Sequence, residues 1–277
     1  MILKYTDKVY FCYNNFMNKW SIRRRRIALS IVIGALVIII GVPLYFFMYK
    51  APTCFDGKKN ADEIGVDCGG SCNLLCSAQS LDIQTKGDAR ILKVATSTYE
   101  VVVSVQNPNP SASILKAGYS FKIYTASSTG PIKIIKNITF VPKASSFVVF
   151  EGPFNLGEAV PTRVVFEWDK ATLVWGKDNV VGADIKVEES VLSNTDKLPK
   201  LEAMVKNFSL GRVTNIELVA LVFDENDNIV GASKTFVDIL APNESTPIVF
   251  TWTNPFMSSS IRSLIFTRIL PDASYIR

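Results

Sequence analysis

Histidine is absent from the 277 residues of this chain, and its absence narrows the chemistry that the protein can perform. Imidazole is the commonest general base in enzymes and the commonest side-chain ligand of transition metals. The phosphate-binding pattern G-x-x-x-x-G-K-[ST] and the nucleophile pattern G-x-S-x-G are also missing. One short match, the S-x-x-K pattern of Ser113 and Lys116, precedes a predicted strand instead of lying on a helix. We therefore expect no enzymatic activity.

Charged side chains are missing from one long stretch, which runs from Ile27 to Tyr49. At a rise of 1.5 Å per residue, a helix of this length crosses a hydrocarbon core about 30 Å thick. A cleaved signal peptide fits less well, because the apolar run is too long and no small-x-small site follows it. Four basic residues precede the run, whereas only Lys50 follows it; the four are Arg23, Arg24, Arg25 and Arg26. The positive-inside rule predicts a single-pass signal anchor in the cell membrane, with residues 1–26 cytoplasmic and residues 50–277 extracytoplasmic.

Excess positive charge is confined to the predicted cytoplasmic tail. Residues 1–26 hold seven basic residues against one acidic residue, whereas residues 50–277 hold 23 against 24. A nucleic-acid interface needs a clustered basic face, so we expect the lipid bilayer as a partner and no nucleic acid. The tail has two interpretations that stay open: an amphipathic helix on the inner leaflet, or a continuation of the helix of residues 27–49.

Cysteine is scarce, and four of the five cysteines lie together just beyond the predicted anchor. These four are Cys54, Cys68, Cys72 and Cys76. Zinc prefers closely paired cysteines in a reducing compartment, whereas an even cluster on the oxidising side of a membrane predicts disulfides. Residues 50–78 contain few apolar side chains, so cross-links would replace a hydrophobic core there. We predict two disulfides, and three connectivities stay open.

Acidic and amide side chains are frequent in the same segment. Oxygen ligands on a loop fixed by disulfides suit Ca²⁺, although the spacing is not that of an EF-hand. The alternative is that these residues form turns and carry solvated surface charges. Calcium is the one candidate cofactor, and its candidate ligands are Asp56, Asn60, Asp62, Glu63 and Asp67.

Residues 54–72 read Cys-x-Asp-Gly-x-x-Asn-x-x-Glu-x-x-x-Asp-Cys-Gly-Gly-x-Cys. This pattern resembles a cysteine-rich motif of uncharacterised bacterial single-pass surface proteins. The resemblance implies an extracytoplasmic bacterial protein and assigns no activity.

Beyond Cys76 the sequence alternates apolar and polar residues, as half-buried β-strands do. The pattern of Val101 to Val105 returns 100 residues later, and several residues recur at that distance. The recurring pairs include Val105 and Val205, Asn107 and Asn207, Pro142 and Pro242, Ser145 and Ser245, Phe150 and Phe250, and Phe166 and Phe266. A constant register predicts a tandem duplication.

Each copy has the length and the turn spacing of an immunoglobulin-like antiparallel β-sandwich. We therefore predict an N-terminal transmembrane helix (residues 27–49) and an all-β ectodomain. The ectodomain is expected to contain the cysteine-rich segment (50–78) and two sandwiches (79–170 and 180–277). Trp168 and Trp252 are the expected large core side chains, and the short junction between the copies predicts two modules in a stiff row.

The strand following Val105-Gln-Asn-Pro-Asn-Pro is similar to strands of late-embryogenesis-abundant type 2 domains. Leu221-Val-Phe-Asp in the second copy resembles the Phe-x-Leu-Tyr-Asp strand of small β-sandwich domains. Both resemblances imply a sandwich fold without a catalytic site.

The organisation favours a membrane-anchored binding, adhesion or envelope-structural protein whose partner is an unknown protein or surface polymer. One candidate contact, if exposed, is the loop of Pro255, Phe256 and Met257; otherwise Phe256 folds inward. The alternative function is an accessory subunit of a membrane-embedded secretion, pilus or transport complex, in which the anchor itself would recognise the other subunits.

Overall fold

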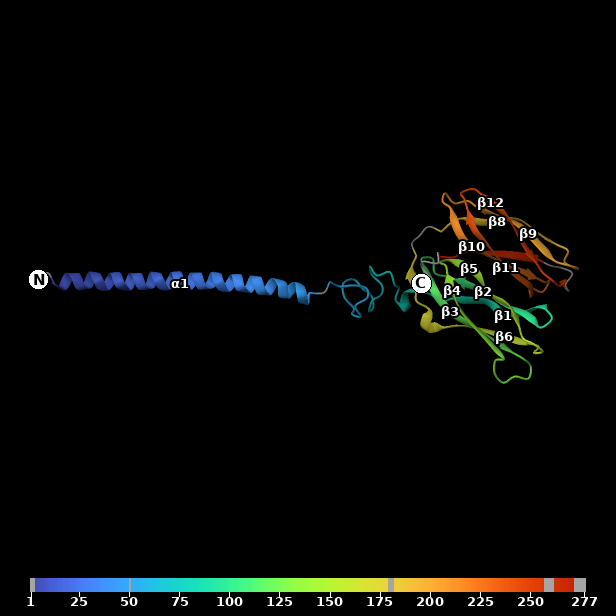
Figure 1. Ribbon diagram of the computed structural model, residues 1–277, viewed down its shortest axis with the longest axis horizontal. Helices are drawn as coiled ribbons and strands as arrows, with labels where there is room; N and C mark the ends of the chain where they lie inside the picture. Colours follow the sequence, from blue (N-terminus) through green and yellow to red (C-terminus); the bar gives the residue numbers. More distant parts are fainter. Residues whose placement is uncertain (1–2, 50, 179–181, 257–261, 272–277) are drawn as a thin grey trace. The chain divides into compact units, whose positions relative to one another are not determined.

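The computed structural model describes residues 3–49, 51–178, 182–256 and 262–271, with side chains from residue 20 onward (Figure 1). The chain divides into two compact units, residues 1–56 and residues 57–277, which are described in turn.

The first unit is dominated by one helix, α1, which runs from Leu3 to Met48. Its part from Trp20 to Met48 has 29 residues, and the most apolar stretch of this part has a mean hydropathy of 2.9 and is not buried within the protein. By length and composition this helix can cross a membrane, as predicted for residues 27–49. Because α1 is continuous from Leu3, the tail backbone extends the apolar helix, which was the second of the two open interpretations.

The second unit begins with the cysteine-rich segment and a short 3₁₀ turn, η1 (Ser77–Gln79), and continues into an all-β fold. In the first sandwich, one sheet has the antiparallel order β1-β2-β5 and the other has the order β4-β3-β6. A short strand, β7, pairs with the beginning of β3, and a 3₁₀ turn, η2, precedes β7. The bounds are β1 Gln84–Ala95, β2 Thr98–Asn107, β3 Ala112–Tyr124, β4 Lys133–Val141, β5 Ser145–Asn155, β6 Arg163–Trp168, η2 Lys170–Thr172 and β7 Gly176–Lys177.

The second sandwich repeats this arrangement strand for strand. Its sheets have the orders β8-β9-β12 and β11-β10-β13. These are the orders β1-β2-β5 and β4-β3-β6 of the first sandwich with seven added to each strand number. The predicted all-β architecture of two antiparallel sandwiches is therefore confirmed (Figure 1). The bounds are β8 Ile185–Ser193, β9 Lys200–Asn207, β10 Val213–Phe223, β11 Ile229–Leu240, β12 Ser245–Thr251 and β13 Arg262–Ile269.

Each sandwich closes around its own apolar core. Phe121 and Phe147 are the largest fully buried side chains of the first core, and Phe250 and Leu201 fill the second. Trp168 and Trp252, the predicted fillers, are only partly buried against these cores. The most enclosed tryptophan is Trp175, which follows η2 and packs into the first core.

Two buried asparagines occupy the same place in the two sandwiches. The side-chain amide of Asn107 donates a hydrogen bond to the carbonyl of Ala112, five residues later, over 2.8 Å. Asn207 donates to the carbonyl of Gly211, only four residues later, also over 2.8 Å. A second carbonyl reached by each amide lies 35 residues later in the first sandwich and 34 in the second. Measured between these hydrogen-bonded positions, the loop after Asn207 is therefore one residue shorter than its counterpart, although strand β10 itself begins one residue later.

Because of this shorter loop, equivalent positions of the two sandwiches are no longer 100 residues apart after the asparagines. The predicted constant spacing of 100 residues is therefore wrong in that part of the chain. Phe250 lies in the core of its own sandwich, whereas Phe150 points out of its sandwich. Phe166 packs on the first core, whereas Phe266 faces away from the second core. In a strand, a shift of one residue moves a side chain to the opposite face of the sheet. The recurring phenylalanines are therefore not structural equivalents, although the strand order is the same.

The two sandwiches share a third apolar cluster, the interface cluster, instead of standing only in a row. It joins the outer face of the sheet β1-β2-β5 to the outer face of the sheet β11-β10-β13. Strands β2 and β10 are therefore buried on both faces, which differs from the half-buried strands predicted from sequence. The members of the interface cluster are Val102, Val148, Phe150, Val219, Leu221 and Ala232.

Candidate functional site

All four cysteines of the cysteine-rich segment are oxidised, as predicted. Cys68 is bonded to Cys76, with Cα atoms 5.1 Å apart, and Cys54 and Cys72 are also disulfide-bonded. The segment is attached to the first sandwich through its backbone, because Leu75 donates to the carbonyl of Trp175 over 2.9 Å. Disulfide formation removes the thiolates that a zinc site would require.

The acidic side chains of this segment bind neighbouring parts of the segment itself. The carboxylate of Asp67 accepts a hydrogen bond from the backbone N–H of Gly57 over 2.9 Å. Glu63 is buried and accepts from the backbone N–H groups of Asn60 and Asp67 over 3.2 and 3.3 Å. The hydroxyl of Ser71 donates to Asp62 over 2.7 Å. This hydrogen bond is the main reason why the pKa of Asp62 is lowered.

These contacts match the alternative in which the acidic residues organise turns. The last of the candidate ligands, Asp56, accepts the backbone N–H of Thr53 over 3.5 Å. Across the described part of the chain, no three carboxylates bring oxygen atoms within 4.8 Å of one another. Calcium binding therefore stays a prediction without a preformed carboxylate cluster behind it.

The four arginines Arg23 to Arg26 lie on α1 and are exposed, directly before the apolar part of the helix. The guanidinium of Arg24 lies over the ring of Trp20, with 3.8 Å between Cζ and the ring centroid. The orientation that these arginines predict stays a prediction.

The candidate contact loop is only partly exposed. Pro255 is exposed, but Phe256 folds inward, with its ring centroid 5.3 Å from that of Trp252 and its edge close to Gly231. Met257 lies outside the described residues. For Phe256, the inward-folded alternative is therefore the one that holds, and this loop presents little apolar surface.

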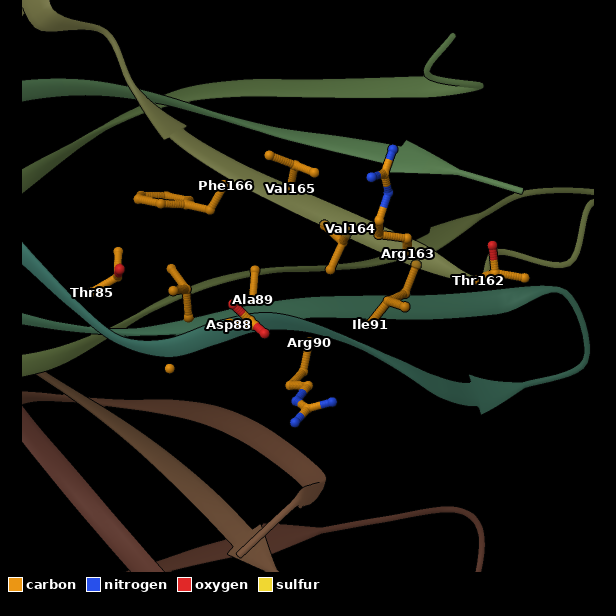
Figure 2. A pocket seen from close by; sticks show the side chains of 12 residues that line it. Thr85, Asp88, Ala89, Arg90, Ile91, Thr162, Arg163, Val164, Val165 and Phe166 are labelled. Atoms are coloured by element: carbon orange, nitrogen blue, oxygen red, sulfur yellow. The ribbon is translucent and has the colours of Figure 1, made fainter. Parts of the chain in front are cut away.

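A cavity of about 520 Å³ lies between the edge strands β1 and β6 of the first sandwich (Figure 2). We call it the edge cavity. Strand β1 is irregular here, because its register with β2 shifts between Lys86 and Arg90, and Gly87 within this bulge has a φ of 78°. A positive φ costs glycine little, which allows the backbone to leave the ladder at this point.

The lining of the edge cavity mixes polar and apolar side chains, and its polar members include Thr85, Asp88 and Thr162. Ala89 on β1 and Val164 on β6 point toward one another (Figure 2). The two arginines at the rim point away from the cavity (Figure 2). Arg90 donates to the side-chain oxygen of Asn228 over 3.4 Å, and the guanidinium of Arg163 lies over a tyrosine ring. The volume falls within the range of small-ligand sites, and the mixed lining offers both polar and apolar contacts.

Arg268 links the two sandwiches and also belongs to a buried ion pair within the second sandwich. Arg268 on β13 donates to the carboxylate of Glu217 on β10, and both side chains are less than a tenth exposed. Arg268 also reaches the first sandwich, where it donates to the hydroxyl of Thr139 over 2.7 Å and to the carbonyl of Phe140 over 2.8 Å. One guanidinium thus holds strands of both sandwiches, in the fork geometry that arginine provides.

Next to this pair, Tyr119 donates to Glu151 over 2.5 Å, and Asn137 donates to the same carboxylate oxygen over 2.8 Å. Burial, and then the hydrogen bond to Glu151, raise the pKa of the Tyr119 phenol. Glu100 is a further buried acid, and its burial raises its pKa to about 7, although the charge of Lys234 acts in the opposite direction. These groups were not predicted as functional residues.

Comparison with known protein families and with curated proteins finds no match to this chain. The site is therefore interpreted from its own residues.

Proposed function

We propose that this chain is a membrane-anchored, extracytoplasmic binding protein without catalytic activity, with an adhesive or envelope-structural role. Its N-terminus would lie in the cytoplasm, because four arginines precede the apolar helix. The disulfides support an oxidising environment for the ectodomain. The cysteine-rich pattern supports a bacterial surface protein, and the shared strand order supports a tandem duplication of one sandwich.

The observation that carries this proposal is the joining of the two sandwiches by the interface cluster and by the hydrogen bonds of Arg268 to Thr139 and Phe140. A flexible string of modules would need no such buried contacts between them. A rigid pair instead presents fixed surfaces, which lowers the entropy that a partner loses on binding. The edge cavity, at the rim of the first sandwich, is the candidate position for a side chain or other small group of that partner.

Crosslinking of intact cells of the native host tests this function. Three forms of the full-length chain are compared: the unmodified chain, a chain with residues 20–49 replaced by an unrelated spanning helix, and Ala89→Phe. Val191→Phe is the matched control, because Val191 is exposed at the corresponding bulge of β8. We expect the anchor replacement and Val191→Phe to retain the captured partner and Ala89→Phe to lose it.

Loss of the partner on anchor replacement, with other membrane proteins recovered in fixed proportion from the unmodified chain, would contradict this proposal. That result would establish an accessory subunit of a membrane complex.

A further inference from the structure

An apolar groove of about 840 Å³ lies where the cysteine-rich segment meets the ends of the sandwiches. We call it the end groove. Its walls include Leu74 from the cysteine-rich segment, Leu115 and Val174 from the first sandwich, and Leu270 and Pro271 after β13. Leu115 is 48% exposed and Val174 is 54% exposed, although both are apolar. Uncovered apolar side chains gathered in one groove mark a site that gains stability when it is covered.

The local backbone explains why these side chains face solvent. The register between β3 and β4 shifts between Ile114 and Ala117, so Leu115 lies in an irregular part of the strand. Val174 lies between η2 and β7, outside any strand. Neither residue is therefore drawn into the core of the first sandwich.

The rim of the end groove is basic. Lys116 is exposed beside Leu115. Lys177 lines the groove and donates to the carbonyl of Gly70 over 2.5 Å. The one acidic residue of the lining, Asp178, forms an ion pair with Lys143 at 3.0 Å. An apolar trough with a positive rim is complementary to an acyl chain that bears an anionic head group.

The length of the chain indicates the source of such a ligand. Eight residues separate Met48, the last residue of α1, from Gly57, and the nine steps between these two residues span at most about 30 Å when fully extended. Leu74 of the cysteine-rich segment forms an isolated bridge with Gly176 beside the groove. In the proposed function α1 lies in a bilayer, so phospholipid is the amphiphile that this short tether makes available to the ectodomain.

We propose that the end groove binds an acyl chain of an anionic phospholipid from the bilayer that anchors the protein, with the head group at Lys116 and Lys177. The proposal rests on the membrane anchorage in the proposed function and is independent of the partner bound at the edge cavity.

Site-specific photo-crosslinking tests the proposal with the full-length chain in lipid nanodiscs. The photoreactive residue p-benzoylphenylalanine replaces Leu115 in one protein and Ile132 in the control. Ile132 is 41% exposed and directly precedes β4, where its backbone N–H donates to the carbonyl of Ile123 near the opposite end of β3, so its exposure is similar but it is remote from the groove. After irradiation, mass spectrometry measures lipid adducts on each peptide, and deuterated oleate added to the discs reveals free fatty acid by its mass.

We expect phospholipid adducts at position 115 and few at position 132. In discs with phosphatidylglycerol, Lys116→Gln should lower the adduct at position 115 about fivefold, because one basic residue near an anionic surface contributes about that much to binding. In phosphatidylcholine discs Lys116→Gln should change little. Val174→Asp, at an exposed position, should abolish the adduct while both disulfides persist in the intact mass.

Equal adducts at the two positions, adducts of oleate alone, or adducts unchanged by Val174→Asp would each overturn the proposal. Capture of a partner in intact cells by the same variants is scored separately, so that failure of the lipid site is distinguished from failure of the proposed function.

Discussion

Glu100 should make the stability of the sandwiches depend on pH. It is 8% exposed on β2, facing Lys234 of the second sandwich, and burial raises its pKa from 4.5 to about 7. Below pH 4.5 the carboxyl is protonated in both the folded and the unfolded chain. As the pH rises to 7, the unfolded chain loses this proton first, so the folded state becomes progressively less favoured. Well above pH 7 the folded chain has also lost the proton of Glu100, and the free energy of unfolding no longer falls for this reason.

The magnitude follows from the same pKa values. A rise from 4.5 to about 7 corresponds to about 3 kcal/mol, and partial access of solvent to the carboxyl reduces this to about 2 kcal/mol. Glu100→Gln keeps the shape of the side chain and removes its titration. We therefore expect this variant to be about 2 kcal/mol more stable than the unmodified chain at pH 8 and no more stable at pH 4.5.

Urea denaturation of the full-length chain in detergent, followed by tryptophan fluorescence between pH 4.5 and pH 8, measures the difference. The matched control is Glu188→Gln, since Glu188 is an exposed strand glutamate. The reasoning is refuted if the difference in unfolding free energy between Glu100→Gln and the unmodified chain is the same at both pH values.

Three further changes test the framework of the ectodomain. Arg268→Leu should lower the free energy of unfolding by about 3–5 kcal/mol, because it leaves Glu217 buried without its cation. The double variant with Glu217→Leu should recover most of this loss. A double variant as unstable as the single one would show that the pair is not the cause. Asn207→Ala should cost about 2–3 kcal/mol, because buried carbonyls lose their donor, and Asn107→Ala should cost a similar amount; a cost below about 0.5 kcal/mol in urea titrations would contradict this role. Cys68→Ser should make the cysteine-rich segment sensitive to limited proteolysis, at a cost of about 2–4 kcal/mol; unchanged proteolysis would show that the cross-link is dispensable.

The long apolar helix, the disulfides and the sandwiches could be predicted because each depends on a local pattern. An uncharged run long enough for a membrane, an even group of cysteines, and apolar alternation are readable without knowing which strands meet. The joining of the sandwiches was not predicted, although a signal was present. Strand β10 contains the unbroken apolar run Leu218 to Phe223, which is typical of a strand covered on both faces.

The residues of the candidate sites were harder to predict. Glu217 is the single charge of the apolar strand β10, which indicates burial, but the sequence does not tell which of the two arginines of β13 it meets. Gly87 inside a strand indicates a bulge, yet the cavity also requires β6 on the other side. The face reversal at Phe250 results from a loop that is one residue shorter, and counting identities at a fixed distance cannot detect it.

The contact between the sandwiches is heterologous: it joins the β1-β2-β5 side of one copy to the β11-β10-β13 side of the other. A head-to-tail contact between similar units has no intrinsic end, and its repetition produces filaments or solenoids. In this protein, charged side chains occupy the two sheets that a third unit would have to join. Lys122 pairs with Glu167 on the sheet β4-β3-β6, and Lys200 pairs with Glu202 on β9. These sheets therefore act as end caps, and growth of the array by further duplication would first require their charges to be replaced.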